Sequence, residues 1–262
     1  VDIADQYNWE KAFKTNTKML FLETPSNPSL DIIDLDHVGK ICNAKKVLLN
    51  VANCFCTPVL QKPAEFGADI VIHSATKYID GQGRALGGII LAREDLMKDI
   101  RFFARHTGPA LSPFNAWLFS KSLETLDLRM QRHSENALKL AQALQKNAEI
   151  EKVIYPFLPD HPGYALAKKQ MKSGGGIVTF ILKGGIDRGR KFLDSLSMLS
   201  HTANLGDTRT IATHPASTTH SKLTDQEREA VGILPGMVRI SAGLENAEDI
   251  LADIEQALRK SV

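Results

Sequence analysis

The segment Ile70-Val71-Ile72-His73-Ser74-Ala75-Thr76-Lys77-Tyr78 decides the fold and the chemistry that the rest of the chain can support. It begins with apolar, β-branched residues, which are typical of a buried strand. The strand leads to a lysine that lies close to two hydroxyl side chains. A buried amine loses its proton easily, and a neutral amine can form a Schiff base with a carbonyl. Together with hydroxyls that can bind a phosphate, Lys77 indicates pyridoxal phosphate. The alternative is a strand-end lysine that faces water.

The first hundred residues contain further elements of an α/β fold. Apolar runs of strand length occur at residues 19–22, 47–51, 68–72 and 88–92. Apolar residues at helical spacing between Asp34 and Asn43 predict a helical connection. Continuous apolar strands that alternate with helices predict a mostly parallel sheet covered on both faces. Ligands of such sheets bind at the carboxyl ends of the strands, where this sequence has Glu23, Asn53 and Lys77.

From Asn115 onward the apolar pattern becomes helical, and helices are predicted to about Lys146. The remaining predicted elements are a strand at 176–182, a helix at 188–196, a helix opened by a capping box at 224–227, a strand at 237–241 and an amphipathic helix at 247–259. This change of pattern predicts a second, smaller α+β domain. We therefore expect a large domain over residues 1–129 and a small domain over residues 130–262.

Composition limits the classes of protein that this sequence can encode. The 262 residues carry a net charge of +2 without a marked run of Lys or Arg, so we expect no nucleic-acid partner. No apolar stretch approaches the ~20 residues that cross a bilayer, so we expect no membrane segment. Three cysteines, Cys42, Cys54 and Cys56, favour a reducing cytoplasm over a disulfide framework. No second Cys/His pair stands at zinc-ligand spacing, so we expect no metal site.

Five motifs spread along the chain resemble those of the Cys/Met-metabolism family of pyridoxal-phosphate enzymes. They are Ser-Ala-Thr-Lys-Tyr at 74–78, Phe-Leu-Glu-Thr-Pro-Ser-Asn-Pro at 21–28, Ser-Pro-Phe-Asn-Ala-Trp at 112–117, His-Pro-Ala-Ser-Thr-Thr-His at 214–220 and Val-Arg-Ile-Ser-Ala-Gly-Leu-Glu at 238–245. The resemblance implies a fold-type I, aspartate aminotransferase-like transferase with pyridoxal 5'-phosphate as its cofactor. It also implies an amino-acid substrate and a cytoplasmic homo-oligomer, either a dimer or a tetramer.

The same resemblance implies roles for single residues. Lys77 would attach the cofactor and later move protons at the substrate carbons, which makes it the catalytic candidate. Ser74 and Thr76 match hydroxyls that bind the cofactor phosphate. Asn27 matches an asparagine near the ring oxygen and the substrate carboxylate, and Arg239 matches the arginine that holds the substrate α-carboxylate. A guanidinium suits that task because it pairs with a carboxylate through two hydrogen bonds.

Asn204 narrows the resemblance within the family. Lyases and cystathionine synthases usually have Ser-Leu-Gly here, whereas homoserine sulfhydrylases have Asn-Leu/Val-Gly-Asp, as this chain does at 204–207. Residues 53–58 and 80–84 also resemble the O-succinylhomoserine sulfhydrylases. The implied reaction is γ-replacement on an O-acylated homoserine: sulfide displaces succinate and homocysteine forms, a step of methionine biosynthesis. A methionine or cystathionine γ-lyase, or a γ-synthase, is the alternative.

The chain departs from the family pattern in two ways. Ala52 occupies the position of an aspartate that pairs with the cofactor ring nitrogen and keeps it protonated, and the sequence shows no obvious substitute. The resemblance also covers only about the carboxyl-terminal two-thirds of a usual member, without the glycine-rich phosphate loop. We therefore expect impaired activity in this chain. A non-catalytic protein of the same fold is the other possibility.

Overall fold

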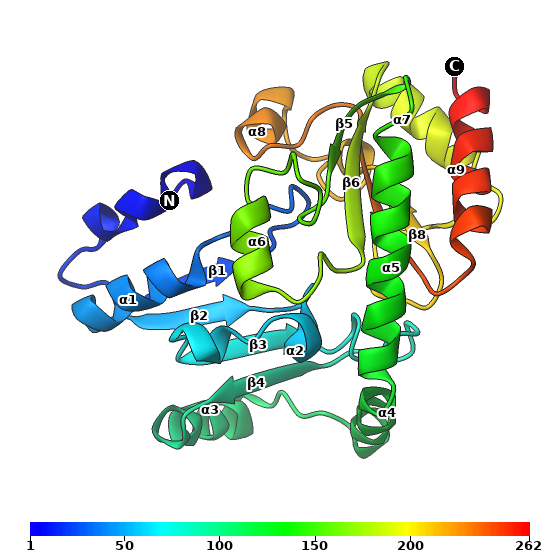
Figure 1. Ribbon diagram of the computed structural model, residues 1–262. Helices are drawn as coiled ribbons and strands as arrows, with labels where there is room; N and C mark the ends of the chain where they lie inside the picture. Colours follow the sequence, from blue (N-terminus) through cyan, green and yellow to red (C-terminus); the bar gives the residue numbers. More distant parts are fainter.

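The first sheet is built from the strands that the apolar runs predict (Figure 1). The structure is a computed structural model that describes residues 1–262, apart from the side chain of Ala4. The strands are β1 (Met19–Glu23), β2 (Leu48–Ala52), β3 (Ile70–Ser74) and β4 (Gly88–Ala92), in that spatial order. The first three strands are parallel, and β4 runs antiparallel to β3 at the edge. The predicted, mostly parallel sheet is confirmed.

The connections between these strands follow from local sequence. They are η1 (Ile3–Ala12) before β1, α1 (Leu35–Lys45) between β1 and β2, and α2 (Thr57–Leu60) with η2 (Pro63–Phe66) between β2 and β3. Helix α1 begins where the Asp34 carboxylate accepts a hydrogen bond from the backbone N–H of His37. Its buried face, with Val38 and Cys42, packs against Leu49 and other apolar residues of the sheet. This core orients the parallel strands.

Three helices link the two halves of the chain: α3 (Glu94–Thr107), α4 (Pro113–Leu123) and α5 (Leu126–Leu144). Helix α5 runs from the level of the first sheet to that of the second (Figure 1). Its Met130 belongs to a cluster with Tyr78 and Leu205, and its Leu140 belongs to the core of the second sheet. The predicted division between residues 129 and 130 therefore falls inside a continuous helix, and the two-domain division stays a prediction.

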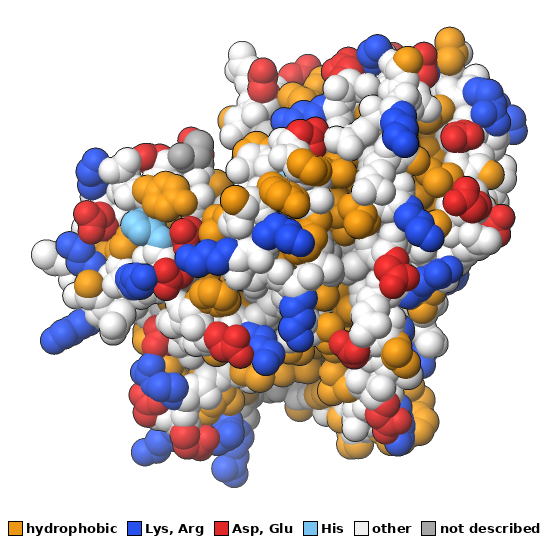
Figure 2. Space-filling view, in the orientation of Figure 1, with side chains coloured by type: hydrophobic (Ala, Val, Ile, Leu, Met, Phe, Trp, Pro, Cys, Tyr) orange, Lys and Arg blue, Asp and Glu red, His pale blue; other side chains and the backbone are white. Residues whose placement is uncertain are grey.

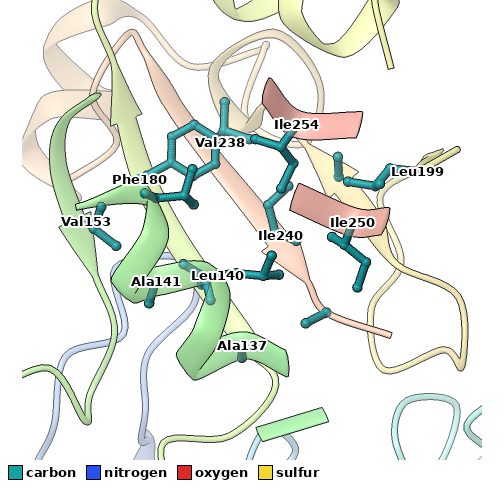
Figure 3. Packing of buried hydrophobic residues seen from close by; sticks show 14 of the residues in the cluster. Ala137, Leu140, Ala141, Val153, Phe180, Leu199, Val238, Ile240, Ile250 and Ile254 are labelled. Atoms are coloured by element: carbon teal, nitrogen blue, oxygen red, sulfur yellow. The ribbon is translucent and has the colours of Figure 1, made fainter. Parts of the chain in front are cut away.

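The second sheet has the spatial order β5-β6-β9-β8-β7 and is antiparallel except for the β7–β8 pair. Its strands are β5 (Ile150–Ile154), β6 (Ile177–Leu182), β7 (Ser200–His201), β8 (Ile211–Thr213) and β9 (Met237–Ser241). The accompanying helices are α6 (Tyr164–Gln170), α7 (Gly185–Asp194), η3 (Pro215–Ser217), α8 (Asp225–Ala230) and α9 (Ala247–Lys260). Figure 3 shows Phe180 of β6, Ile240 of β9, Leu140 of α5 and Ile254 of α9 in one buried core.

One expectation about the first sheet is wrong in part, because the sheet is not covered on both faces. Ile90 and Leu91 of β4 are about half exposed, and α3 buries no residue. Figure 2 shows hydrophobic side chains on the surface at the lower right, over α4. No helix among the described residues is long and apolar enough to cross a bilayer.

Candidate active site

The carboxyl ends of the parallel strands bring the predicted site residues to one edge of the first sheet. Glu23 ends β1, Ala52 ends β2 and Ser74 ends β3. Glu23 lies opposite Ala52 in the ladder, and Ala52 lies opposite Ile72. The turn that follows β3 carries Lys77. These strand ends therefore lie together, as expected, and their contact with a ligand stays a prediction.

Lys77 is half-buried, and its amine donates a hydrogen bond to Oδ1 of Asn204 over 2.6 Å. Burial lowers the pKa of this amine below its usual range, and the nearby positive charge of Arg239 lowers it further. A lowered pKa increases the share of neutral amine, which is the nucleophilic form.

The loop that carries Asn204 approaches the backbone of Lys77 closely. Gly206 adopts a positive φ of 78°, and a Cβ at this residue would stand 2.6 Å from the backbone nitrogen of Tyr78. Only glycine tolerates both the conformation and the approach. The sequence therefore needs glycine two residues after Asn204 if the amide is to reach the lysine.

Arg129 fixes the other side of the Lys77 turn, and the sequence analysis did not single it out. Its guanidinium, on α5, donates to the carbonyl oxygens of Tyr78 at 2.5 Å and Ile79 at 3.3 Å. The same group donates to the carbonyl of Ser122 at 2.9 Å. A buried arginine that binds three backbone oxygens holds the turn in one conformation. Nothing in the sequence set it apart, because α5 also carries the charged residues Asp127, Arg132, Glu135 and Lys139.

Arg239 lies at the centre of the second sheet and is 4% exposed. It donates to Oδ1 of Asn27 at 2.9 Å and to the carbonyl oxygens of Ala203 and Asn204 at 3.1 and 3.2 Å. Its Nε has no hydrogen-bond partner among the described residues. The structure thus brings Lys77, Asn204, Asn27 and Arg239 into one connected group, although they come from four separate segments.

The two predicted phosphate-binding hydroxyls have different surroundings. The Thr76 hydroxyl accepts from the backbone N–H of Gly87 at 3.2 Å and donates to its carbonyl at 3.4 Å. The backbone N–H of Ser74 donates to Sγ of Cys54 at 3.1 Å, while no hydrogen bond of the Ser74 hydroxyl is found among the described residues. Their predicted contact with a phosphate stays a prediction.

Cys54 also lies within this site, although the sequence analysis gave it no role there. Burial raises the pKa of its thiol, the Ser74 N–H lowers it, and the charges of Glu23 and Lys77 act on it in opposite directions. The described residues contain no group of three or more His, Cys, Asp or Glu side chains that could hold a metal ion.

The donor set suits an aldehyde cofactor and an amino-acid substrate at every predicted position except one. Lys77 offers an amine whose pKa is lowered by burial, and Arg239 offers a buried cation with an unpaired N–H. Ala52 is buried and presents only a methyl group where the resemblance calls for a carboxylate. Its neighbour Glu23 carries a carboxyl whose pKa burial raises and Arg239 lowers, with burial the larger influence.

Residues 1–259 match the model of the family described as "Cys/Met metabolism PLP-dependent enzyme". The chain belongs to this family. It is 49% identical over 256 residues to an O-succinylhomoserine sulfhydrylase of Pseudomonas aeruginosa, covering 98% of this chain and 64% of that protein. It is 46% identical over 263 residues to an L-methionine gamma-lyase of Fusobacterium nucleatum, covering 99% of this chain and 67% of that protein. The chain therefore spans about two thirds of the length of these relatives.

Solved structures of the same family share the fold. A cystathionine gamma-lyase from Lactobacillus plantarum, complexed with L-serine, superposes with a TM-score of 0.95 at 34% identity, covering 99% of this chain and 68% of that one. The metB protein of Corynebacterium glutamicum gives a TM-score of 0.93 at 38% identity, with 99% and 67% covered. These likenesses confirm the predicted fold-type I class, and the family description confirms pyridoxal phosphate as the predicted cofactor.

Proposed function

We propose that this chain belongs to an enzyme that performs γ-replacement on an O-acylated homoserine. O-succinylhomoserine and sulfide would give homocysteine and succinate. The observation that carries this proposal is the 2.6 Å hydrogen bond between Lys77 and Asn204, because Asn204 is the residue that resembles the sulfhydrylases. The 49% identity to an O-succinylhomoserine sulfhydrylase supports the same choice. The substrate would be an amino acid whose carboxylate binds Arg239.

Each residue of the connected group would have a task. Pyridoxal phosphate, when bound, supplies a conjugated electron acceptor for the substrate carbons. Lys77 would bind the cofactor aldehyde and then carry protons between substrate carbons, which its lowered pKa favours. Arg239 would hold the substrate carboxylate and Asn27 would orient Arg239. Ser74 and Thr76 would bind the phosphate.

A γ-lyase that degrades methionine is the second candidate. It is supported by the L-methionine gamma-lyase of Fusobacterium nucleatum, which is 46% identical to this chain. Ala52 supports a third reading, a protein of this fold whose catalysis is impaired or lost, because a methyl group cannot stabilise a positive charge at the ring nitrogen.

We also propose that the chain works as a homo-oligomer, a dimer or a tetramer. Support comes from large apolar side chains that are exposed on α3 and α4, including Phe102, Phe103, Phe114 and Trp117. Apolar groups gathered on a surface favour contact with another protein surface.

The test begins with the cofactor. The purified chain is mixed with pyridoxal phosphate, reduced with borohydride and digested, and the modified peptide is identified by mass. We expect the label on Lys77 and none in Lys77→Ala, with Lys222→Ala as a control that keeps the label. A label spread over surface lysines would contradict the site.

The second step compares substrates, using protein whose Lys77 has been shown to take up the cofactor label. Homocysteine is measured with O-succinylhomoserine and sulfide, and 2-oxobutanoate is measured with L-methionine. Homocysteine formation that exceeds lysis of methionine supports the sulfhydrylase. The opposite ratio supports the lyase, and no turnover together with Lys77 labelling supports the impaired protein.

A further inference from the structure

The absence of a carboxylate at Ala52 leaves the cofactor ring nitrogen without the partner that the family resemblance implies. Ala52 is 8% exposed and its side chain has no polar atom. A pyridine nitrogen holds its proton at neutral pH when an anion lies beside it, because the ion pair favours the charged form. A substitute must therefore be an ionisable acid at the same sheet edge.

Glu23 meets the geometric requirement. Its Cα is the direct partner of the Ala52 Cα in the parallel ladder between β1 and β2. Paired residues of neighbouring strands project to the same face, and the strands lie about 4.8 Å apart. Glutamate is one methylene longer than aspartate. A carboxylate on the neighbouring strand can therefore reach toward the space that an aspartate at position 52 would fill.

The surroundings of Glu23 place it among the site groups. Its carboxyl is part-buried and makes no hydrogen bond or salt bridge in the described part of the chain. It interacts electrostatically with Arg239 and with Cys54, and these two residues also act on Lys77. A part-buried acid without a hydrogen-bond partner, at the end of the sheet where Ala52 lies, is suited to a cationic ligand.

We propose that Glu23 takes the place of the missing aspartate and stabilises the protonated ring nitrogen of bound pyridoxal phosphate. The inference rests on the proposed cofactor site at Lys77 and deepens it. It explains how a chain with Ala52 can keep the charge that its chemistry needs. It also gives this part-buried acid a function beyond packing.

A double-mutant cycle tests whether Glu23 does the work that an aspartate at position 52 would do. The affinity for pyridoxal phosphate is measured by absorbance titration in four proteins: the wild type, Glu23→Gln, Ala52→Asp and the double variant. We expect Glu23→Gln to weaken binding about tenfold in the wild type but less than about twofold in Ala52→Asp, where the new carboxylate replaces it. Glu65→Gln, which removes an exposed acid, serves as the matched control and should leave the affinity unchanged.

A second measurement reports on the ring nitrogen itself, and its result for the wild type alone is decisive. Pyridoxal phosphate labelled with ¹⁵N in the ring is bound to the wild type, and its nitrogen chemical shift is recorded at neutral pH. We expect the protonated form in the wild type and in Ala52→Asp, and the unprotonated form in Glu23→Gln. The unprotonated form in the wild type would overturn the inference even if Glu23→Gln failed to fold.

The outcomes separate this inference from the proposed function. Absence of a specific label on Lys77 in the wild type would refute the cofactor site and the role of Glu23 together. With Lys77 labelled, equal losses of affinity on Glu23→Gln in both backgrounds would indicate a purely structural residue and overturn the inference alone. Melting temperatures are measured for all four proteins without cofactor. They identify any loss of affinity that comes from a less stable fold.

Discussion

The amine of Lys77 and the side-chain oxygen of Asn204 lie 2.6 Å apart, although 127 residues separate them in the chain. One residue follows a strand of the first sheet, and the other precedes β8 of the second. The contact therefore couples the two sheets at the proposed site. It also makes residue 204, which distinguishes subgroups of the family by resemblance, a direct neighbour of the proposed catalytic amine.

Replacement of Asn204 should change the acidity of Lys77. The amide oxygen accepts from the amine and stabilises its charged form more than its neutral form. We expect Asn204→Ala to lower the pKa of Lys77 further, by up to about one unit. The pH dependence of trinitrobenzenesulfonate modification, followed on the Lys77 peptide, measures this change.

The matched variant Asn204→Asp places a negative charge beside the same amine. It should raise the pKa of Lys77 and move the modification profile to higher pH. If the two variants moved the profile in the same direction, the hydrogen bond would not control the amine.

Arg239 should act on Lys77 through its charge. The pKa of Lys77 is lowered first by burial and then by the positive charge of Arg239, so a neutral residue at 239 should raise it. We expect Arg239→Met to shift the modification profile of Lys77 to higher pH by up to about one unit. Arg239→Lys keeps the charge and should leave the profile near that of the wild type. If the profile moved upward equally in Arg239→Met and Arg239→Lys, the cause would be lost burial of Lys77 and not the charge at residue 239.

The four strands of the first sheet, and β6 and β9 of the second, could be predicted from the sequence because a buried strand needs a continuous apolar run, and each run is local. The strand-end positions of Glu23 and Lys77 followed in the same way. The ends of some helices did not. The pattern predicted a helix at 188–196, but α7 begins at Gly185, directly after its N-cap Gly184. A glycine pair indicates a break in the sequence, and only the surrounding structure allows a helix to begin there.

Several elements were not predicted from the sequence, among them α3 and the strands β5, β7 and β8. Helix α3 has Leu96, Ile100 and Phe103 at helical spacing, but it buries none of its side chains, so its apolar face belongs to no core of this chain. Contacts between distant segments could also not be predicted from local sequence patterns. The hydrogen bond of Arg239 to Asn27 spans 212 residues and depends on the docking of β9 against the loop after β1. Family resemblance had grouped these residues, and local sequence physics had not.

Asp253 should be important for stability far from the proposed site. Its carboxylate accepts hydrogen bonds from the backbone N–H groups of Ser197, Met198 and Leu199, each at 2.9 Å. Burial alone would raise the pKa of Asp253, but these donors outweigh it and the pKa lies below its usual value. We expect Asp253→Asn to lower the free energy of unfolding by about 2 kcal/mol at pH 7. Urea unfolding measures the difference.

The same pKa shift sets how this difference depends on pH. The folded pKa of Asp253 lies below the unfolded value, so its stabilisation is present above about pH 4. It is lost as the pH falls through the folded pKa. The gap between wild type and Asp253→Asn should therefore narrow in acid, and a gap that widened there would contradict the assignment.

His133 should make the fold sensitive to mild acid. Its ring is buried on α5, Nδ1 lies 2.6 Å from the carbonyl oxygen of Ala242, and Nε2 has no hydrogen-bond partner among the described residues. Burial lowers its pKa from the ordinary 6.5 to about 4, the Ala242 carbonyl opposes this, and Arg129 adds to it. Between these two values the unfolded chain binds a proton that the folded chain rejects. The free energy of unfolding should therefore fall with decreasing pH across this window, by about 3 kcal/mol for this residue.

The variant His133→Gln isolates that contribution, because glutamine does not titrate and its amide can still donate to the Ala242 carbonyl. Other buried histidines with lowered pKa values, His73, His161 and His214, titrate in both proteins and cancel in the comparison. Urea unfolding between pH 7 and pH 4 should show a steeper loss of stability in the wild type than in the variant. Parallel curves would mean that the pKa of His133 in the folded chain equals its unfolded value, so that the folded core takes up the proton beside the positive charge of Arg129.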